Sequence, residues 1–329
     1  MQTPTVVING AGIDGPALGF WLSRKGYRVI MLELAPGIRP GGQTVDLRGS
    51  GGESVERMGL MDRMRAHALD QKGAAWVRSD GSRRAEMPVT AFNGNGLVSK
   101  LEILRGDLAG VLYEATREDV EYRFNATVAM LESGEDAVTV TLADGSRLTA
   151  DLVVGADGPH SAVRRIAFGP EEEFVSPISG YNAWFSAPDT VGLDGWFLLY
   201  QAPGGLNASM RPSHDPSIAK AGLAFQSEPI PYHRSDLGAQ RQLLIERFAG
   251  AGWHCDALLA AAAEADDFYF DAFAQVHMPT WTSGRVTLVG DAGYCASPLS
   301  GMDTSLALVG AIRAGRRTRL RRPIGHRAP

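Results

Sequence analysis

Three short apolar runs, far apart along the chain, each end in a glycine that lies beside an acidic residue. The runs and the turns after them are Val6-Val7-Ile8 before Gly10-Ala11-Gly12-Ile13-Asp14-Gly15, Leu152-Val153-Val154 before Gly155-Ala156-Asp157-Gly158, and Val286-Thr287-Leu288-Val289 before Gly290-Asp291. A short apolar run bounded by glycine is typical of a strand that is buried on both faces of a parallel sheet. The pattern therefore predicts three buried strands, each followed by a glycine turn.

The first of these strands opens a predicted strand-helix-strand unit. Its strands are Thr5–Asn9 and Arg28–Leu32. Pro16 suits the first turn of the helix between them, and Gly26 suits the end of that helix. This order of elements is typical of a parallel α/β sheet.

The middle of the chain mixes helical and strand patterns. Apolar positions at spacings of three and four make 101–118 the clearest predicted helix, and 53–69 is predicted to be helical as well. The glycine-rich segment 36–52 is predicted to be a loop over a ligand. Strands are predicted over 137–142, 147–150 and 151–155, with a turn at Asp144-Gly145.

Residues from about 170 to 279 differ in composition from the rest of the chain, because tryptophan and tyrosine are concentrated there. Alternating runs over 180–187 and 196–201 predict an antiparallel sheet, and 239–248 and 256–265 are predicted helices. The aromatic residues of 181–200 either line a substrate pocket or form the core of this sheet. We therefore expect an α/β fold, in which an antiparallel-sheet domain is inserted into a Rossmann-like domain.

The first glycine turn matches G-x-G-x-x-G, the pattern that binds a dinucleotide. Gly10 permits the tight turn, Gly12 lets the backbone approach a pyrophosphate, and Gly15 lets the helix pack closely on the strand. The helix N-terminus then offers amide donors and a positive dipole to the phosphates. Glu33 ends the second strand, where an acid can bind an adenosine ribose. This unit fits NAD or FAD, and the chain has no second such motif.

Composition narrows the class of protein. With 44% hydrophobic and 21% charged residues, the sequence is that of an ordinary soluble protein without a membrane-spanning run or a secretory signal. Two cysteines, Cys255 and Cys295, suit a reducing cytoplasm. We expect Cys295 to be a small buried thiol. The histidines lack metal-site spacing, so no metal is expected.

Charge is distributed unevenly along the chain. The net charge is −5, but 311–329 contains seven arginines and no acid, so the rest carries −5 − 7 = −12. An acidic body of this kind is not expected to bind nucleic acid.

The second and third motifs carry a resemblance to a known family. Asp157-Gly158-Pro159-His160-Ser161-Ala162-Val163-Arg164 matches D-G-x-x-S-x-V-R, and 290–301 matches a G-D-A run that continues to a proline and a glycine. Together with the first motif, they resemble FAD-dependent aromatic hydroxylases of the para-hydroxybenzoate hydroxylase type, which include polyketide and tetracycline hydroxylases. The resemblance covers about 3–310. It implies an FAD-binding domain over 1–70, 98–172 and 280–312, a substrate domain over 71–97 and 173–279, and a basic tail over 313–329.

The resemblance also implies which residues hold FAD. Arg105 and the first motif would bind adenosine and pyrophosphate, Asp291 the ribityl or pyrophosphate region, and Pro298–Thr304 the isoalloxazine. Asp46 lies in the loop that covers flavin in relatives, and Asp157 either links flavin and nicotinamide binding or caps a turn. The predicted cofactor residues are Gly10, Gly12, Ile13, Asp14, Gly15, Glu33, Leu34, Gln43, Arg48, Arg105, Asp157, Gly290, Asp291, Pro298, Ser300, Gly301, Met302 and Asp303. No catalytic residue is assigned.

The implied reaction is the hydroxylation of an aromatic or polyketide-like small molecule. NAD(P)H would reduce FAD, O₂ would react with the reduced flavin, and the C4a-hydroperoxide would deliver the hydroxyl group. Two alternatives stay open: a related flavin reductase or dehydrogenase, and a truncated homologue with impaired flavin binding and no catalysis.

The chain departs from the family at two places. Asp303 stands where relatives have glycine, at the start of a helix beside the flavin, and we expect its charge to impair flavin binding or reduction. The apolar pattern of 306–311 then gives way to arginines, which predicts a truncated or frameshifted end whose tail is disordered or newly packed. A genuine basic tail that docks a partner is the alternative.

Overall fold

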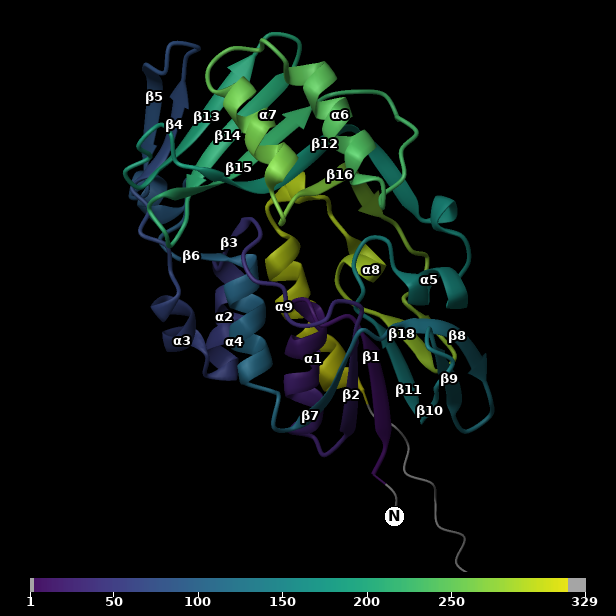
Figure 1. The fold of residues 1–329 in the computed structure, drawn as a ribbon. Coiled ribbons are helices and arrows are strands. Elements are labelled where there is room, and N and C mark those ends of the chain that lie inside the picture. The colour runs from purple at the N-terminus through teal and green to yellow at the C-terminus, as the bar shows by residue number, and fades with distance from the viewer. Residues whose placement is uncertain (1–2, 319–329) are drawn as a thin grey trace, which may run out of the picture.

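The computed structural model describes residues 3–318 and contains two large sheets, one above the other in Figure 1. The lower sheet has six strands in the order β17-β18-β11-β1-β2-β7. All its pairings are parallel except that of β17 with β18. Its strands are β1 (Thr5–Asn9), β2 (Arg28–Glu33), β7 (Val120–Phe124), β11 (Leu152–Gly155), β17 (Thr282–Ser283) and β18 (Val286–Leu288).

Helices cover one face of the six-stranded sheet, and a small antiparallel sheet covers the other. Val6 and Ile8 on β1 point into the helical side, whereas Val7 points to the small sheet, because side chains alternate along a strand. The helices are α1 (Asp14–Ser23), α2 (Gly49–Met58), α3 (Met61–Ala66), α4 (Arg105–Glu114) and α9 (Asp303–Arg317). The small sheet consists of β8 (Val128–Ser133), β9 (Val138–Leu142) and β10 (Arg147–Ala150). These layers confirm the predicted α/β class.

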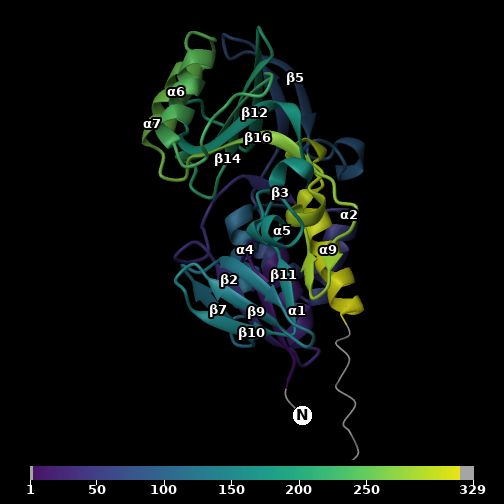
Figure 2. The same cartoon turned by 90° about the vertical axis from the view of Figure 1, so that its right-hand side faces the viewer.

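The upper sheet has seven strands in the order β16-β12-β15-β14-β13-β4-β5. They are β4 (Gly73–Val77), β5 (Arg83–Pro88), β12 (Val175–Pro188), β13 (Trp196–Ala202), β14 (Leu206–Pro212), β15 (Ile218–Phe225) and β16 (Tyr269–Val276). Two helices, α6 (Leu237–Phe248) and α7 (Cys255–Glu264), cover one face of this sheet (Figure 2). All seven strands come from 73–88 and 175–276. The boundaries of the expected substrate domain remain a prediction.

Alternation along β12 decides which side chains enter the core under α6 and α7. Tyr181, Ala183 and Phe185 belong to that core, together with Phe248 of α6. Asn182 therefore points to the opposite face. Because Tyr181 and Phe185 lie in the core cluster, those aromatic residues serve packing rather than a substrate pocket.

Some predicted elements were wrong. Leu101 does not begin a helix, because β6 (Glu102–Leu104) pairs with β3 (Thr44–Asp46) inside the segment expected to be a loop. The helix expected over 53–69 is two helices, α2 and α3, separated at Gly59, whose φ is 72°.

The expected basic tail, 313–329, begins inside a helix. Helix α9 continues to Arg317, and its buried residues include Ala311, Ile312 and Gly315, so apolar packing extends past the predicted break. The rest of the predicted tail, 319–329, lies outside the described residues. Over 3–318, no helix is long and apolar enough to cross a membrane.

Candidate functional site

The three glycine-acid motifs meet at one edge of the six-stranded sheet. Strands β1, β11 and β18 are parallel neighbours, with Asn9 paired to Gly155 and Gly155 to Leu288. The carboxyl ends of parallel neighbours lie at the same edge, where open α/β sheets bind ligands. Glu33, at the end of β2, is next in line. The structure thus gathers segments that are up to about 280 residues apart in sequence.

The first turn has the close packing that its glycines predict. Gly10 has a φ of 110°, and a Cβ on it would overlap the carbonyl group of Ala156. A Cβ on Gly15 would likewise overlap the carbonyl oxygen of Gly10. Glu33 Oε2 accepts a hydrogen bond of 2.9 Å from the amide of Ala11, which fixes the turn beside the end of β2.

Arg105 lies over this turn. It is the first residue of α4, and a Cβ on Gly12 would lie 3.3 Å from Arg105 Nη2. The carbonyl of Gln43 accepts the amide hydrogen of Arg105, and that of Gly41 accepts the amide hydrogen of Gly106, so the glycine-rich segment holds the start of α4. Among residues 3–318, the guanidinium has no hydrogen bond or ion pair within 4.0 Å, and it is therefore available to an anion.

Three aspartates meet beside the first turn, and each is the first residue of a helix. Asp14 begins α1, Asp291 begins α8 (Asp291–Tyr294) and Asp303 begins α9. A Cβ on Gly290 would overlap the carboxylate of Asp14. A carboxylate oxygen of Asp291, one of Asp303 and the sulfur of Cys295 lie within 4.8 Å of one another. Each positive helix end therefore has a carboxylate of its own.

Burial raises the pKa values of all three aspartates. Burial, followed by the charge of Asp291, raises the pKa of Asp14 to about 7 and that of Asp303 to about 6. Burial also raises the pKa of Asp291, and the charge of Arg105 counteracts it. Within 3–318, Asp14 Oδ1 and Asp303 Oδ1 are buried without a hydrogen-bond partner. Both oxygens are free to accept hydrogen bonds from hydroxyl groups.

The other predicted residues occupy varied positions. Asp157 accepts hydrogen bonds from Asn9 Nδ2 and from the amides of Ala162 and Val163, so it caps α5 (Ala162–Ala167). This geometry favours the capping alternative for Asp157. The thiol of Cys295 is buried, as expected, and burial raises its pKa to about 12.

The remaining predicted residues lie around the same edge. Arg48 Nη2 is 2.6 Å from Asp46 Oδ2, and this ion pair lies within the glycine-rich segment 36–52. Leu34 and Met302 are exposed, and Ile13 is buried at the start of α1. The single turn η3 (Pro298–Ser300) and Gly301, with a φ of 62°, lead into α9.

Sequence reasoning missed the side chains on the face of the upper sheet that is turned toward this edge. Arg211 Nη1 lies 3.2 Å from Glu102 Oε2 on β6, and Lys220 Nζ is 3.1 Å from Asp267 Oδ2. A Cβ on Gly41 would lie 3.0 Å from Lys220 Nζ. The alternation of β14 and β15 was the available signal, but alanine and glycine in these strands weaken it.

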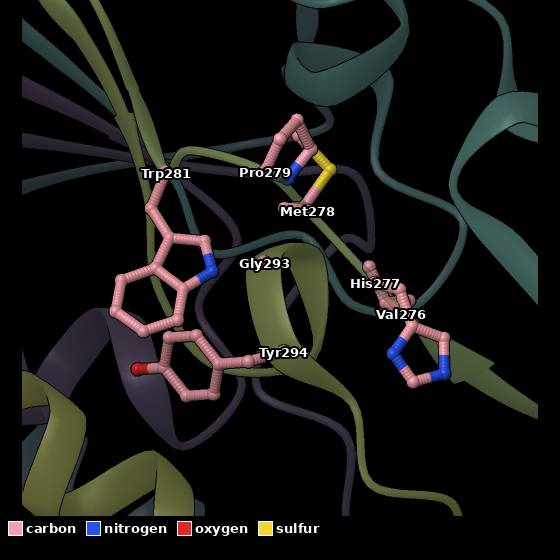
Figure 3. A pocket seen from close by; sticks show the side chains of 7 residues that line it. All are labelled: Val276, His277, Met278, Pro279, Trp281, Gly293 and Tyr294. Atoms are coloured by element: carbon pink, nitrogen blue, oxygen red, sulfur yellow. The ribbon is translucent and has the colours of Figure 1, made fainter.

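A cavity of about 440 Å³ lies beside α8, and none of its lining residues is a predicted cofactor residue (Figure 3). Trp281 and Tyr294 form one wall, with their rings 5.2 Å apart in an edge-to-face arrangement. The lining residues are Val276, His277, Met278, Pro279, Trp281, Gly293 and Tyr294.

The residues at the sheet edge fit FAD. The glycine turn leaves room for a pyrophosphate, and Arg105 offers an unpaired cation next to it. The buried oxygens Asp14 Oδ1 and Asp303 Oδ1, which lack partners within 3–318, can accept hydrogen bonds from hydroxyl groups of the cofactor. Their charges, by contrast, oppose the anionic parts of the cofactor.

Comparisons with known proteins agree with FAD binding. A family model described as FAD binding domain matches residues 3–315. A flavin-dependent monooxygenase of Legionella longbeachae is 39% identical over 94% of this chain and 79% of its own length. An uncharacterized protein of Mycobacterium tuberculosis is 42% identical, over 94% of this chain and 84% of its own. The crystal structure of the tetracycline destructase Tet(51) superposes with a TM-score of 0.86 at 34% identity, covering 96% of this chain and 81% of that one.

Proposed function

Because the chain belongs to the FAD binding domain family of flavin-dependent monooxygenases, we propose that it oxidises an aromatic or polyketide-like small molecule with NAD(P)H and O₂. The observation that carries the proposal is the convergence of three glycine-acid turns at one sheet edge, with an unpaired Arg105 above them. FAD supplies the electron and oxygen transfer when it is bound, and the protein supplies position and electrostatics.

Each part of the edge has a distinct role in this proposal. Gly10, Gly12 and the start of α1 hold the pyrophosphate, and Arg105 neutralises its charge. Glu33, whose Oε2 already holds the turn, faces the adenosine ribose. Asp291 accepts hydrogen bonds from the ribityl hydroxyls. Residues 298–304 surround the flavin ring.

The substrate is proposed to lie between this edge and the upper sheet. The facing side of that sheet carries cations beside apolar surface: Arg211 stacks over the ring of Phe197 at 3.9 Å, and Lys220 is buried. Such a face suits a flat, oxygen-rich molecule, because it places two charged donors beside an aromatic ring. The Tet(51) relative, whose name refers to tetracycline, supports a polycyclic substrate of this kind.

A second candidate is a homologue that binds FAD weakly and does not catalyse oxidation. Asp14 and Asp303 favour it, because each places a carboxylate at a helix N-terminus that would otherwise attract an anion. A flavin reductase that does not transfer oxygen is the third. These candidates differ in cofactor affinity and in the fate of O₂.

One series of measurements separates the three. The protein is purified with added FAD at pH 6, reduced anaerobically with NADH or NADPH, and then mixed with isotopically labelled O₂ and a panel of phenolic and polyketide compounds. A monooxygenase stays yellow, is bleached by the nicotinamide, and transfers one labelled oxygen atom to a product. Bleaching without a labelled product indicates a reductase, and a colourless protein indicates the weak binder; either result contradicts the proposal.

A further inference from the structure

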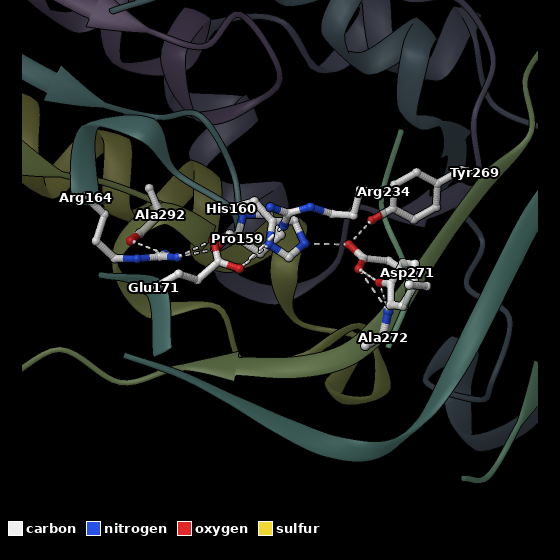
Figure 4. Close-up of polar contacts among 10 residues, drawn as sticks. Pro159, His160, Arg164, Glu171, Arg234, Tyr269, Asp271, Ala272 and Ala292 are labelled. Carbon is white, nitrogen blue, oxygen red and sulfur yellow. Dashed lines mark hydrogen bonds and ion pairs between the residues drawn. The ribbon is translucent and has the colours of Figure 1, made fainter. Parts of the chain in front are cut away.

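A partly buried polar network joins the segment between β11 and α5 to the edge of the upper sheet (Figure 4). His160 lies at its centre, with Nδ1 2.9 Å from Glu171 Oε1 and Nε2 2.8 Å from Asp271 Oδ2. Glu171 belongs to the single turn η2 (Glu171–Glu173), and Asp271 belongs to β16. One imidazole ring therefore connects three elements, and one of them is part of the upper sheet.

The contact with Asp271 requires a proton on Nε2. Asp271 is only 6% exposed, and its oxygens already accept hydrogen bonds of 2.8 Å from the hydroxyls of Tyr232 and Tyr269. The amide of Ala272 donates to Oδ1 as well, at 2.9 Å. Because both carboxylate oxygens act as acceptors, His160 Nε2 is the donor in this contact.

The contact with Glu171 requires a proton as well. Burial raises the pKa of Glu171, and the charges of Arg164 and Arg165 lower it. Arg164 and Arg234 lie 3.7 and 3.5 Å from Glu171. Arg234 Nη1 donates to the same Glu171 Oε1 at 3.5 Å, so this oxygen acts as an acceptor and His160 Nδ1 is the donor. The His160 ring therefore carries a proton on both nitrogens, one more than a neutral imidazole ring carries.

We propose that His160 is a positioning residue: as a double donor, it holds β16 and the Tyr269 hydroxyl against the six-stranded sheet, and it releases them when it loses a proton. A neutral imidazole ring has a single N–H donor. Its other nitrogen is an acceptor that would face a carboxylate oxygen, and that contact would be repulsive. Around the ring, the charged and titratable groups are Glu171, Asp271 and Arg234. Arg164, Arg165, Tyr232, Tyr269 and, on its own segment, Asp157 complete the set.

The direction of the pH effect follows from proton linkage. The folded network binds an extra proton relative to the unfolded chain near neutral pH, so the contact is stronger at pH 6 than at pH 9 and weakens as the pH rises through this range. The inference goes beyond the proposed oxidation and requires no cofactor, so its failure would leave the proposed function untouched.

Two readouts on the full chain test the proposal. The first is the ¹⁵N spectrum of the histidine rings, recorded from pH 6 to pH 9. The second is hydrogen exchange of the β16 amides, with each variant compared with wild type at the same pH. The variants are H160Q, which keeps one donor, and H160K, which keeps its charge. The control is H214Q, because His214 lies 2.7 Å from Asp107 Oδ2, a single carboxylate, and is more exposed.

We expect both nitrogens of His160 to carry protons at pH 7. We also expect β16 to exchange about tenfold faster in H160Q than in wild type at pH 6, and equally fast at pH 9, as for the loss of one charge-assisted hydrogen bond. H160K should protect β16 at both pH values, and H214Q should not change its exchange. A singly protonated ring at pH 7, or an H160Q effect of equal size at both pH values, overturns the proposal. If the variants do not fold, the wild-type ring spectrum decides.

Discussion

Replacing Asp14 by asparagine is expected to remove a pH dependence from FAD binding. Asp14 is the first residue of α1, at the helix end where the pyrophosphate is proposed to lie, and Asp14 Oδ1 is buried without a partner. Its carboxylate would repel the phosphates when ionised. With a pKa of about 7, the side chain changes charge within the neutral range.

The magnitude follows from Coulomb's law and linkage. Two like charges about 6 Å apart repel by roughly 3 kcal/mol at an effective dielectric of about 20, which weakens binding about 100-fold. If the protonated form is the one that binds, the FAD dissociation constant increases about tenfold between pH 6 and pH 8, because the protonated fraction falls by that factor. Asparagine at position 14 should give tighter binding at pH 8 and should remove this tenfold contribution to the pH dependence.

Quenching of FAD fluorescence by the apoprotein measures these dissociation constants. The matched control is D62N, because Asp62 also lies in the first turn of a helix but its side chain is 98% exposed. D62N should bind FAD as wild type does at every pH. Equal pH dependence in wild type and D14N would refute the reasoning, since the titrating group would then lie elsewhere.

Three further variants test the rest of the site. D303G should raise the flavin midpoint potential, measured by dye-coupled reduction, by up to about 90 mV, the equivalent of roughly 4 kcal/mol for like charges about 4 Å apart; an unchanged potential would place Asp303 outside the flavin's field. G10A should abolish FAD binding and lower the melting temperature, because Gly10 has a φ of 110° and no room for a Cβ, whereas G110A, with open space around it and a φ outside the left-handed region, should bind FAD normally. R105A should weaken FAD binding about 10- to 100-fold by fluorescence titration, as for the loss of hydrogen bonds to a charged group, and R117A, on an exposed site, should not; equal losses would contradict the role of Arg105.

Local patterns predicted the strands that carry the glycine turns. Thr5–Asn9 was predicted with the bounds that β1 has, and Arg147–Ala150 with those of β10, because apolar runs and turn residues define both ends. The boundary at Leu104 was missed. Residues 101–104 continue the apolar spacing of α4, but Glu102–Leu104 forms strand β6 and pairs with β3. Neighbouring strands, not the segment itself, decide that pairing.

In the candidate site, too, local sequence predicts some features, and tertiary packing decides the others. The turns themselves were visible in sequence, and parallel order then places them at one edge. The approach of Asp14 to Gly290 was not, because the two residues follow β1 and β18, which come together only when both strands pair with β11. His160 lies inside the second glycine-acid motif, but its partner Asp271 is 111 residues away and carries no local signal.

A structure of the FAD complex at pH 6 tests the central claim most directly. That claim is that the three glycine-acid turns form one FAD site under Arg105. We predict that the pyrophosphate lies within hydrogen-bonding distance of the Gly12 amide and the Arg105 guanidinium, with the ribityl chain beside Asp291. FAD bound elsewhere, or a pyrophosphate out of reach of both groups, would contradict it.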